Sequence, residues 1–485
     1  MPDRIPNWIN GVECPAAEGA WSVKFNPHDG RPLSELARSQ AADVQAAVAA
    51  ARAAQPAWDA TPAVQRGLLL HKLVRLMQDH ADTIGRIVAA ETGKTIADGI
   101  GETGGAVECG LFFASEGQRL YGKTCTSGAP NKMAMTLRRP VGVTGLIIAA
   151  NTPIANVAWK LFPALVCGNA AVLKAAEDTP ATAWMMGKLA RKAGLPDGVV
   201  NIVQGLGREA GASLVEHADV DLISFTGSTA VGRYVQEAAG RRLARVSLEL
   251  GGKNPLVVCE DADLENAVKW TVLSAFSNAG QRCASCSRVI VHKAVYEEFK
   301  SRLLSRTAQL EVGNQEGADV GPVINELQLS NMLAAVREAR EQGAELLIGG
   351  QRLSDPDHAD GYYMAPTVIE GADPSSSIST TELFGPILCI YGADDYHGAM
   401  ALANRSPYGL TAAIHTRNID RALQFARDAE CGVAVVNAGT YGSEPHMPFG
   451  GVKQSGNGWR EPGTEAIEVY TELKDVYILL DSPRP

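Results

Sequence analysis

The chain has 485 residues, so two or three domains are expected rather than one small core. Hydrophobic residues make up 46% of the sequence and charged residues 20%, the ordinary proportions of a globular protein. The formal net charge of -10 excludes the basic footprint of a nucleic-acid-binding protein. No uninterrupted apolar segment predicts a membrane span, because polar residues and prolines break the longest apolar-leaning stretch, Val141–Leu173.

The number of cysteines and the first residues of the sequence indicate the cellular compartment. Nine cysteines, a sparse and odd number, favour a reducing, cytoplasmic setting. Residues 1–11 lack the apolar core of a secretory signal. Cys283 and Cys286 form a C-x-x-C pair, but no second pair and no clustered histidines accompany it, so no metal site is predicted.

In chain order, residues 1–26 mix Trp, Pro and Gly and predict irregular structure or short strands. Helical spacing of apolar residues predicts helices over Asp43–Trp58, Val64–Ala90 and Asp98–Leu120, with a break at Glu91-Thr92-Gly93-Lys94. Lys123–Arg139 is short, polar and nearly alternating, which is typical of a projecting β-ribbon.

The rest of the chain alternates strands with helices. Strands are predicted at 141–149, 171–174, 199–203 and 222–225, and a second alternating block covers 256–445. This alternation favours parallel, doubly wound sheets and an α/β fold. The last apolar alternation, Ala466–Leu479, predicts a terminal strand that pairs between subunits.

One thiol and one carboxylate are the strongest candidates for catalysis. Cys283 ends the turn Gly280-Gln281-Arg282-Cys283, and a thiol attacks a carbonyl only as thiolate. Glu249 precedes Leu250-Gly251-Gly252, where a carboxylate on a glycine hinge could serve as a base. Considered alone, a single cysteine is more often a small buried hydrophobic residue.

Two strand ends carry residues suited to a dinucleotide. Phe225-Thr226-Gly227-Ser228, with Gly232 beyond it, follows a strand and opens a helix, where backbone N–H groups hold pyrophosphate. The turn lacks G-x-G-x-x-G, so a plain strand–helix turn is an equal alternative. Lys174 and Glu177 could bind ribose hydroxyls, and a carboxylate there repels a 2′-phosphate and favours NAD over NADP. Solvated charges at a strand end are the alternative.

Four further residues belong to shorter motifs. Asn151 follows a buried strand and could donate to an oxyanion, although Asn before Thr-Pro is more often a turn residue. Glu382 could bind a ribose, and Phe384 could press on a nicotinamide. Phe449 begins a glycine-rich turn predicted to border the site.

Together these motifs, in this order and spacing, resemble the aldehyde dehydrogenase superfamily from about Trp8 to Tyr477. The resemblance implies two doubly wound α/β domains, a Rossmann-like cofactor domain and a catalytic domain, plus a β-ribbon oligomerisation arm. The NAD-binding domain would comprise residues 1–120 and 141–250, the catalytic domain 251–450, and the oligomerisation elements 121–140 and 451–485. A homodimer or homotetramer is expected.

The resemblance also implies a mechanism for oxidising a small-molecule aldehyde. Cys283 would form a thiohemiacetal and then a thioester, Asn151 would hold the oxyanion, and Glu249 would activate water. Lys160 would steady the cofactor and Glu249. The expected NAD-binding residues are Lys174, Glu177, Phe225, Gly227, Ser228, Gly232, Leu250, Glu382 and Phe384.

Family positions also indicate a substrate pocket, formed by Glu108, Phe112, Thr152, Asn156, Trp159, Arg282, Ser285, Tyr441 and Phe449. Its aromatic rings suit an aromatic or medium-chain aldehyde, whereas Arg282 could hold the carboxylate of a semialdehyde. The segment 456–463 resembles semialdehyde-oxidising branches. Ala149-Ala150 and Thr152 depart from the family pattern around Asn151. A CoA-acylating enzyme and a catalytically silent structural homologue are the alternatives.

Overall fold

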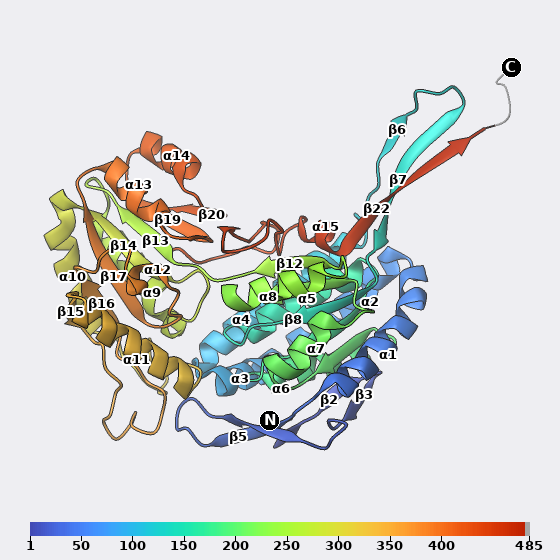
Figure 1. Ribbon diagram of the computed structural model, residues 1–485, viewed down its shortest axis with the longest axis horizontal. Coiled ribbons are helices and arrows are strands. Elements are labelled where there is room, and N and C mark those ends of the chain that lie inside the picture. Colours follow the sequence, from blue (N-terminus) through green and yellow to red (C-terminus); the bar gives the residue numbers. More distant parts are fainter. Residues whose placement is uncertain (481–485) are drawn as a thin grey trace.

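The protein is described here by a computed structural model that places residues 1–480 and contains two seven-stranded sheets (Figure 1). The first sheet has the order β12-β11-β8-β9-β10-β2-β3. Its strands are β2 (Asn7–Ile9), β3 (Val12–Cys14), β8 (Val143–Ile147), β9 (Ala170–Lys174), β10 (Val200–Val203), β11 (Leu222–Thr226) and β12 (Arg245–Glu249). The strands β8 to β12 are parallel, and β2 and β3 extend the sheet in antiparallel fashion. The predicted doubly wound α/β class is therefore confirmed.

Helices cover both faces of the first sheet. They are α1 (Ala41–Ala60), α2 (Ala63–Asp79), α3 (Ala81–Thr92), α4 (Ile96–Glu116), α5 (Pro153–Val166), α6 (Pro180–Ala193), α7 (Ala212–Glu216) and α8 (Thr229–Gly240). One hydrophobic core lies between the sheet and α1, α7 and α8, and another between the sheet and α2, α4, α5 and α6. These two cores explain why β8 and β9 are fully buried.

The prediction of one helix over Val64–Ala90 was wrong. His80, with φ of -109° and ψ of 15°, ends α2 and begins α3. Met77 before the break and Ile84 after it are both buried, so the apolar repeat continues across the break. No Gly or Pro lies at the break, and the 3.6-residue apolar period alone could not reveal that the helix is interrupted at His80. The predicted break after Glu91 is confirmed, because Gly93 ends α3 in the left-handed conformation.

The second sheet has the order β15-β16-β17-β14-β13-β19-β20, and only β15 pairs in antiparallel fashion. Its strands are β13 (Asn254–Val258), β14 (Cys286–His292), β15 (Glu345–Ile348), β16 (Thr367–Glu370), β17 (Ile387–Ala393), β19 (Thr411–His415) and β20 (Val433–Val436). The accompanying helices are α9 (Leu264–Phe276), α10 (Tyr296–Ala308), α11 (Glu326–Glu341), α12 (Ser377–Thr380), α13 (Tyr396–Asn404) and α14 (Ile419–Asp428). Smaller strands are β1 (Arg4–Ile5), β4 (Trp21–Phe25), β5 (Pro32–Ala37), β18 (Tyr408–Gly409) and β21 (Val452–Lys453).

A β-ribbon projects from the body (Figure 1). It consists of β6 (Thr124–Thr126), β7 (Lys132–Pro140) and β22 (Thr471–Leu479), and β22 pairs with β7 from Thr471 opposite Pro140 to Leu479 opposite Lys132. The expected strand over Ala466–Leu479 was wrong for its first residues, which form the helical turn α15 (Ala466–Tyr470). That turn buries Ile467, Val469 and Tyr470 in the core between the first sheet and α2, α4, α5 and α6. Residues 481–485 of the predicted oligomerisation element lie outside the described residues.

The two sheets meet at opposite ends of their strands. The chain leaves the carboxyl end of β12 at Glu249 and enters the amino end of β13 at Asn254. Residues that follow the first sheet's strands therefore face residues that precede the second sheet's strands. Within residues 1–480, no helix is both long and apolar enough to cross a membrane.

Candidate active site

A cavity of about 420 Å³ lies where the two sheets meet. The first sheet contributes the segments after β8, β11 and β12, and the second sheet contributes the loops before β14 and β17. The sequence-predicted residues that line the cavity are Asn151, Thr152, Asn156, Trp159, Gly227, Ser228, Glu249, Leu250, Cys283, Glu382, Phe384 and Phe449. The structure thus brings the candidate nucleophile, the candidate base and most of the cofactor motifs to one place.

The loop before β14 holds Cys283 in a fixed backbone. Gly280 is left-handed, and a Cβ on it would lie 2.1 Å from the carbonyl oxygen of Gly385, so only glycine fits. The side-chain amide of Asn254 donates to the carbonyls of Cys283 (2.7 Å) and Ser285 (2.9 Å). The nucleophile is therefore fastened both to β13 and to the loop before β17.

The resting thiol of Cys283 is neutral at physiological pH. Burial and the nearby carboxyl groups of Glu382 and Glu249 raise its pKa to about 12. Trp159, Tyr441 and Phe449 pack around it in a small apolar cluster. The geometry therefore requires a proton acceptor before the sulfur can attack.

Glu249 has the environment of a carboxyl kept available as a base. Within residues 1–480, no group donates a hydrogen bond to either of its buried carboxylate oxygens. Its pKa is raised well above the usual value by burial and by the charge of Glu461, while Lys160 and Arg460 act in the opposite direction. A carboxylate with a raised pKa is a stronger proton acceptor than an ordinary glutamate.

Glycines around the two carboxylates have a packing role. A Cβ on Gly251 would lie 2.0 Å from the carboxylate of Glu382, and one on Gly450 would lie 2.7 Å from that of Glu249. The N–H of Gly252 donates to Glu382 at 3.0 Å. The glycines after Glu249 thus allow Glu382 to approach the backbone closely.

Glu382 and Phe384 precede β17. Burial raises the pKa of Glu382 to about 7, although the N–H of Gly252 and the charge of Lys253 oppose the shift. Phe384 has a φ of 57°, which is unusual for an aromatic residue. Strain of this kind persists where the surroundings impose it, and it is concentrated at functional sites.

The turn between β11 and α8 fits a pyrophosphate. Gly227 and Ser228 line the cavity, and the hydroxyl of Ser228 caps α8 by accepting from the N–H of Val231. Gly232 and Phe225 lie behind this surface. A Cβ on Gly232 would lie 2.5 Å from Leu250, and one on Gly227 would meet the ring of Phe225. These two residues shape the turn from outside the cavity.

Lys174 and Glu177 lie outside the cavity lining but at the same carboxyl edge of the sheet. The ammonium group of Lys174 binds Glu177 at 2.9 Å. Burial would raise the pKa of Glu177, but the charge and hydrogen bond of Lys174 outweigh it and the pKa is lowered. An ionised carboxylate beside a lysine at the end of a parallel strand suits a ribose diol.

Lys160 is buried behind the cavity in a polar cluster. Its ammonium group binds Ser224 at 2.6 Å and Glu461 at 2.9 Å. Glu461 is itself fully buried and also accepts from the hydroxyls of Ser224, Ser247 and Tyr470. Lys160 therefore acts on Glu249 through its charge.

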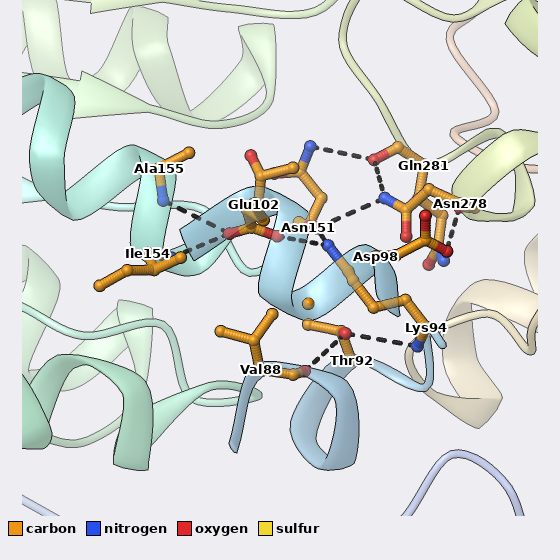
Figure 2. Close-up of polar contacts among 12 residues, drawn as sticks. Val88, Thr92, Lys94, Asp98, Glu102, Asn151, Ile154, Ala155, Asn278 and Gln281 are labelled. Atoms are coloured by element: carbon orange, nitrogen blue, oxygen red, sulfur yellow. Dashed lines mark hydrogen bonds and ion pairs between the residues drawn. The ribbon is translucent and has the colours of Figure 1, made fainter. Parts of the chain in front are cut away.

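Asn151 follows β8 and begins the approach to α5. Its amide donates to the carbonyl oxygen of Gln281 at 2.9 Å, and its backbone carbonyl accepts from Lys94 at 2.9 Å (Figure 2). The acceptor Gln281 lies two residues before Cys283 in the chain, and Asn151 lines the same cavity as Cys283. An amide in this cavity could donate to an oxyanion that forms beside Cys283.

Five residues expected in the substrate pocket do not line this cavity, namely Glu108, Phe112, Arg282, Ser285 and Tyr441. Arg282 turns to the hydroxyl of Ser277, and its guanidinium lies 4.7 Å from the ring centre of Tyr441. Glu108 is exposed, and Phe112 packs edge-on against Phe113. The aromatic contribution to the cavity comes from Trp159 and Phe449, whose ring centres are 5.3 Å apart.

Comparison with known proteins identifies this arrangement. The aldehyde dehydrogenase family model matches residues 16–476. Alpha-ketoglutaric semialdehyde dehydrogenase of Bacillus subtilis is 37% identical over 475 residues, covering 97% of each chain. The chain belongs to the aldehyde dehydrogenase family.

Solved structures agree with this aldehyde dehydrogenase over its whole length. Betaine aldehyde dehydrogenase of Staphylococcus aureus, in complex with NAD+, superposes with a TM-score of 0.96 at 30% identity and covers 99% of this chain and 96% of that one. An NADP dependent enzyme of Escherichia coli gives a TM-score of 0.95 at 35% identity, with 98% of both chains covered. Similar folds are thus described with either dinucleotide.

Sequence reasoning missed several residues of this aldehyde dehydrogenase site. Asn254 holds the Cys283 loop, Glu461 anchors Lys160, and Lys94 binds the Asn151 carbonyl. None has a local motif that names its role. In the sequence Lys94 and Glu461 stand among polar residues, glycine and proline, so no local signal indicated that their side chains are buried.

Proposed function

We propose that this aldehyde dehydrogenase oxidises an aldehyde to the carboxylic acid and that NAD is its cofactor. The observation that supports the proposal is the shared cavity of Cys283, Glu249 and Asn151, which also contains the turn Gly227-Ser228. Mixing the enzyme with NAD and a panel of aldehydes should raise the absorbance of NADH. Absence of NADH with every aldehyde would favour a catalytically silent homologue.

The first half of the reaction forms a carbon–sulfur bond. The Cys283 thiol releases its proton to solvent water, and the sulfur attacks the carbonyl carbon while the carbonyl electron pair moves to oxygen. The amide of Asn151 and the N–H of Cys283 donate to that oxyanion. The turn Gly227-Ser228 and Glu382 would hold NAD, which would supply the acceptor for the hydride that this carbon loses. Cys283 then holds the acyl group as a thioester.

The second half breaks the same bond. Glu249 takes a proton from water as the water oxygen attacks the thioester carbon, and the sulfur leaves with the bonding pair. The acid departs and Cys283 regains its proton. Lys160 and Glu461 stay paired behind Glu249, so their opposed charges tune its pKa throughout.

The position of Glu249 favours hydrolysis over transfer of the acyl group to coenzyme A. A CoA-acylating enzyme would need no base for water, whereas this carboxylate lies in the cavity with the thiol. Product formation should therefore be independent of added coenzyme A. A rate that depends on coenzyme A would support the alternative.

For the substrate we propose an aromatic or medium-chain aldehyde, including ω-carboxylated semialdehydes. Trp159 and Phe449 supply apolar surface, and the Bacillus subtilis relative is named for a semialdehyde. Arg282 would reach a distal carboxylate only after leaving Ser277 and Tyr441. Comparison of kcat/KM for benzaldehyde and for a semialdehyde of similar length separates these classes.

The Glu177 carboxylate should enforce a preference for NAD. Because it is ionised beside Lys174, it repels a 2′-phosphate, and Glu177→Gln should raise the NADP/NAD ratio of kcat/KM by at least about 10-fold. The ratio is measured by steady-state NADH and NADPH formation. An equal ratio in the wild-type enzyme and the variant would contradict this assignment.

We also propose that the ribbon joins subunits. Met133, Leu137, Leu473 and Tyr477 are exposed on β7 and β22. Deleting residues 474–485 should lower the molecular mass in analytical ultracentrifugation, because β7 loses most of its partner strand. The deletion retains α15 and its buried Tyr470, so the thermal midpoint should change little. An unchanged mass would contradict the proposal.

The domain boundaries and the cytoplasmic location stay predictions.

A further inference from the structure

Outside the cavity, a buried ion pair joins α4 to the loop after α3 (Figure 2). The ammonium group of Lys94 lies 2.5 Å from the carboxylate of Glu102, and their side chains are only 5% and 8% exposed. Neither residue lines the cavity. A buried pair is costly unless further hydrogen bonds satisfy both groups, so the remaining contacts of each group indicate what the pair holds in place.

The other oxygen of Glu102 caps α5. It accepts the N–H groups of Ile154 (3.0 Å) and Ala155 (3.3 Å) in the first turn of that helix. Thr152, the N-terminal cap residue by position, makes no side-chain cap bond. A carboxylate from another helix therefore meets the positive end of α5, where a negative charge is stabilised.

Lys94 fixes the peptide on the other side of the same turn. It donates to the carbonyl oxygen of Asn151 at 2.9 Å. The amide of Asn278, from the Cys283 loop, donates more weakly to that oxygen at 3.4 Å. The segment of residues 151 to 155, which connects β8 to α5, is thus held at both ends by the Lys94–Glu102 ion pair. The Asn151 side chain projects from this segment to Gln281, beside Cys283.

We propose that Lys94 and Glu102 are positioning residues that set the place of the Asn151 amide relative to Cys283. The inference rests on the proposed function, in which that amide stabilises the oxyanion. Loss of either partner leaves a buried charge unpaired and frees the segment 151–155 to shift. A shift of about 1 Å at a reacting group can cost about 100-fold in rate.

A double-mutant cycle tests the pair. In the enzyme that retains Asn151, Lys94→Met should lower kcat by about 10- to 100-fold, a loss comparable to that caused by removing an oxyanion donor. The KM for NAD should stay within about 2-fold of the wild-type value. In the Asn151→Ala background the same change should lower kcat by no more than about 2-fold, because the amide that Lys94 positions is absent. Glu102→Gln, which preserves size, should behave in the same way and serves if Lys94→Met folds poorly.

The possible outcomes distinguish a failure of the proposed oxyanion role of Asn151 from a failure of the positioning role of Lys94 and Glu102. If Asn151→Ala leaves kcat unchanged, the oxyanion role in the proposed function is wrong. If Asn151→Ala lowers kcat but the Lys94 and Glu102 effects are the same in both backgrounds, the positioning role is wrong and the proposed function stands. Arg86→Met, which removes the exposed Arg86–Asp82 pair on α3, is the matched control and should leave kcat unchanged.

Discussion

Cys283→Ala should abolish NADH formation, with kcat reduced by at least about 10⁴-fold, while NAD binding is retained. The variant loses the only thiol that lines the cavity within the described residues 1–480. The cofactor turn Gly227-Ser228 belongs to the other sheet and does not depend on this side chain. Steady-state absorbance measures the first effect, and calorimetric titration with NAD measures the second.

Cys286→Ala is the matched control. Cys286 lies three residues later and is buried, with its sulfur directed to the carbonyl of Arg288 at 3.6 Å. It does not line the cavity, so its loss should leave kcat within about 3-fold of the wild-type value, apart from a modest cavity effect on stability. Wild-type turnover in Cys283→Ala, or equal losses in both variants, would contradict the assignment of the nucleophile.

The fold was largely predictable because its parallel strands are buried on both faces. Such strands appear as short apolar runs, and the helices between them have a clear 3.6-residue period. Two failures have a common physical cause. At His80 the helical period continues through a break, and at Ala466–Tyr470 an apparent strand period conceals a buried helical turn. In both segments the apolar period is compatible with either structure, so the period alone cannot decide between them.

The site was predictable where function depends on a local turn. Cys283, Glu249 and Gly227-Ser228 lie at the strand ends where the sequence places them. Contacts between distant residues were not predictable, even for Lys160, which the family resemblance placed near Glu249. Lys160 and Glu461 are 301 positions apart, and no spacing rule connects them. Arg282 illustrates the opposite error, because its neighbour Cys283 faces the cavity while its own side chain turns to Ser277.

The arrangement also explains why the proposed catalytic groups come from both halves of the chain. Carboxyl ends of parallel strands place the cofactor turn and Glu249 at one edge, as in other open α/β sheets. Cys283 instead precedes its strand, so it approaches from the second sheet. A rigid-body movement of one sheet relative to the other would change the distance between the Cys283 sulfur and the Glu249 carboxylate without changing either sheet. Asn254 fastens the Cys283 loop to β13 of the second sheet, so the loop would move together with that sheet.

Glu249→Gln should separate the two halves of the reaction. The amide cannot take a proton from water, so acylation proceeds and hydrolysis stalls. Rapid mixing should show a burst of about one NADH per active site, followed by a steady rate lower by about 10²- to 10⁴-fold. Mass spectrometry of the quenched enzyme should find the acyl group on Cys283. A variant without a burst would mean that Glu249 is needed before the thioester forms.

The pH dependence of the wild-type enzyme provides a second measure of the same group. Glu249 must be ionised to act as a base, and burial with the charge of Glu461 raises its pKa well above the usual value. The hydrolytic rate should therefore be low at acidic pH and increase as pH rises through that raised pKa. Removing the negative charge with Glu461→Gln should make ionisation of Glu249 easier and move the acid limb to lower pH, provided that Lys160 still contributes its positive charge. Another group would control hydrolysis if the acid limb of the pH–rate profile lay at the same pH in Glu461→Gln and was still present in Glu249→Gln.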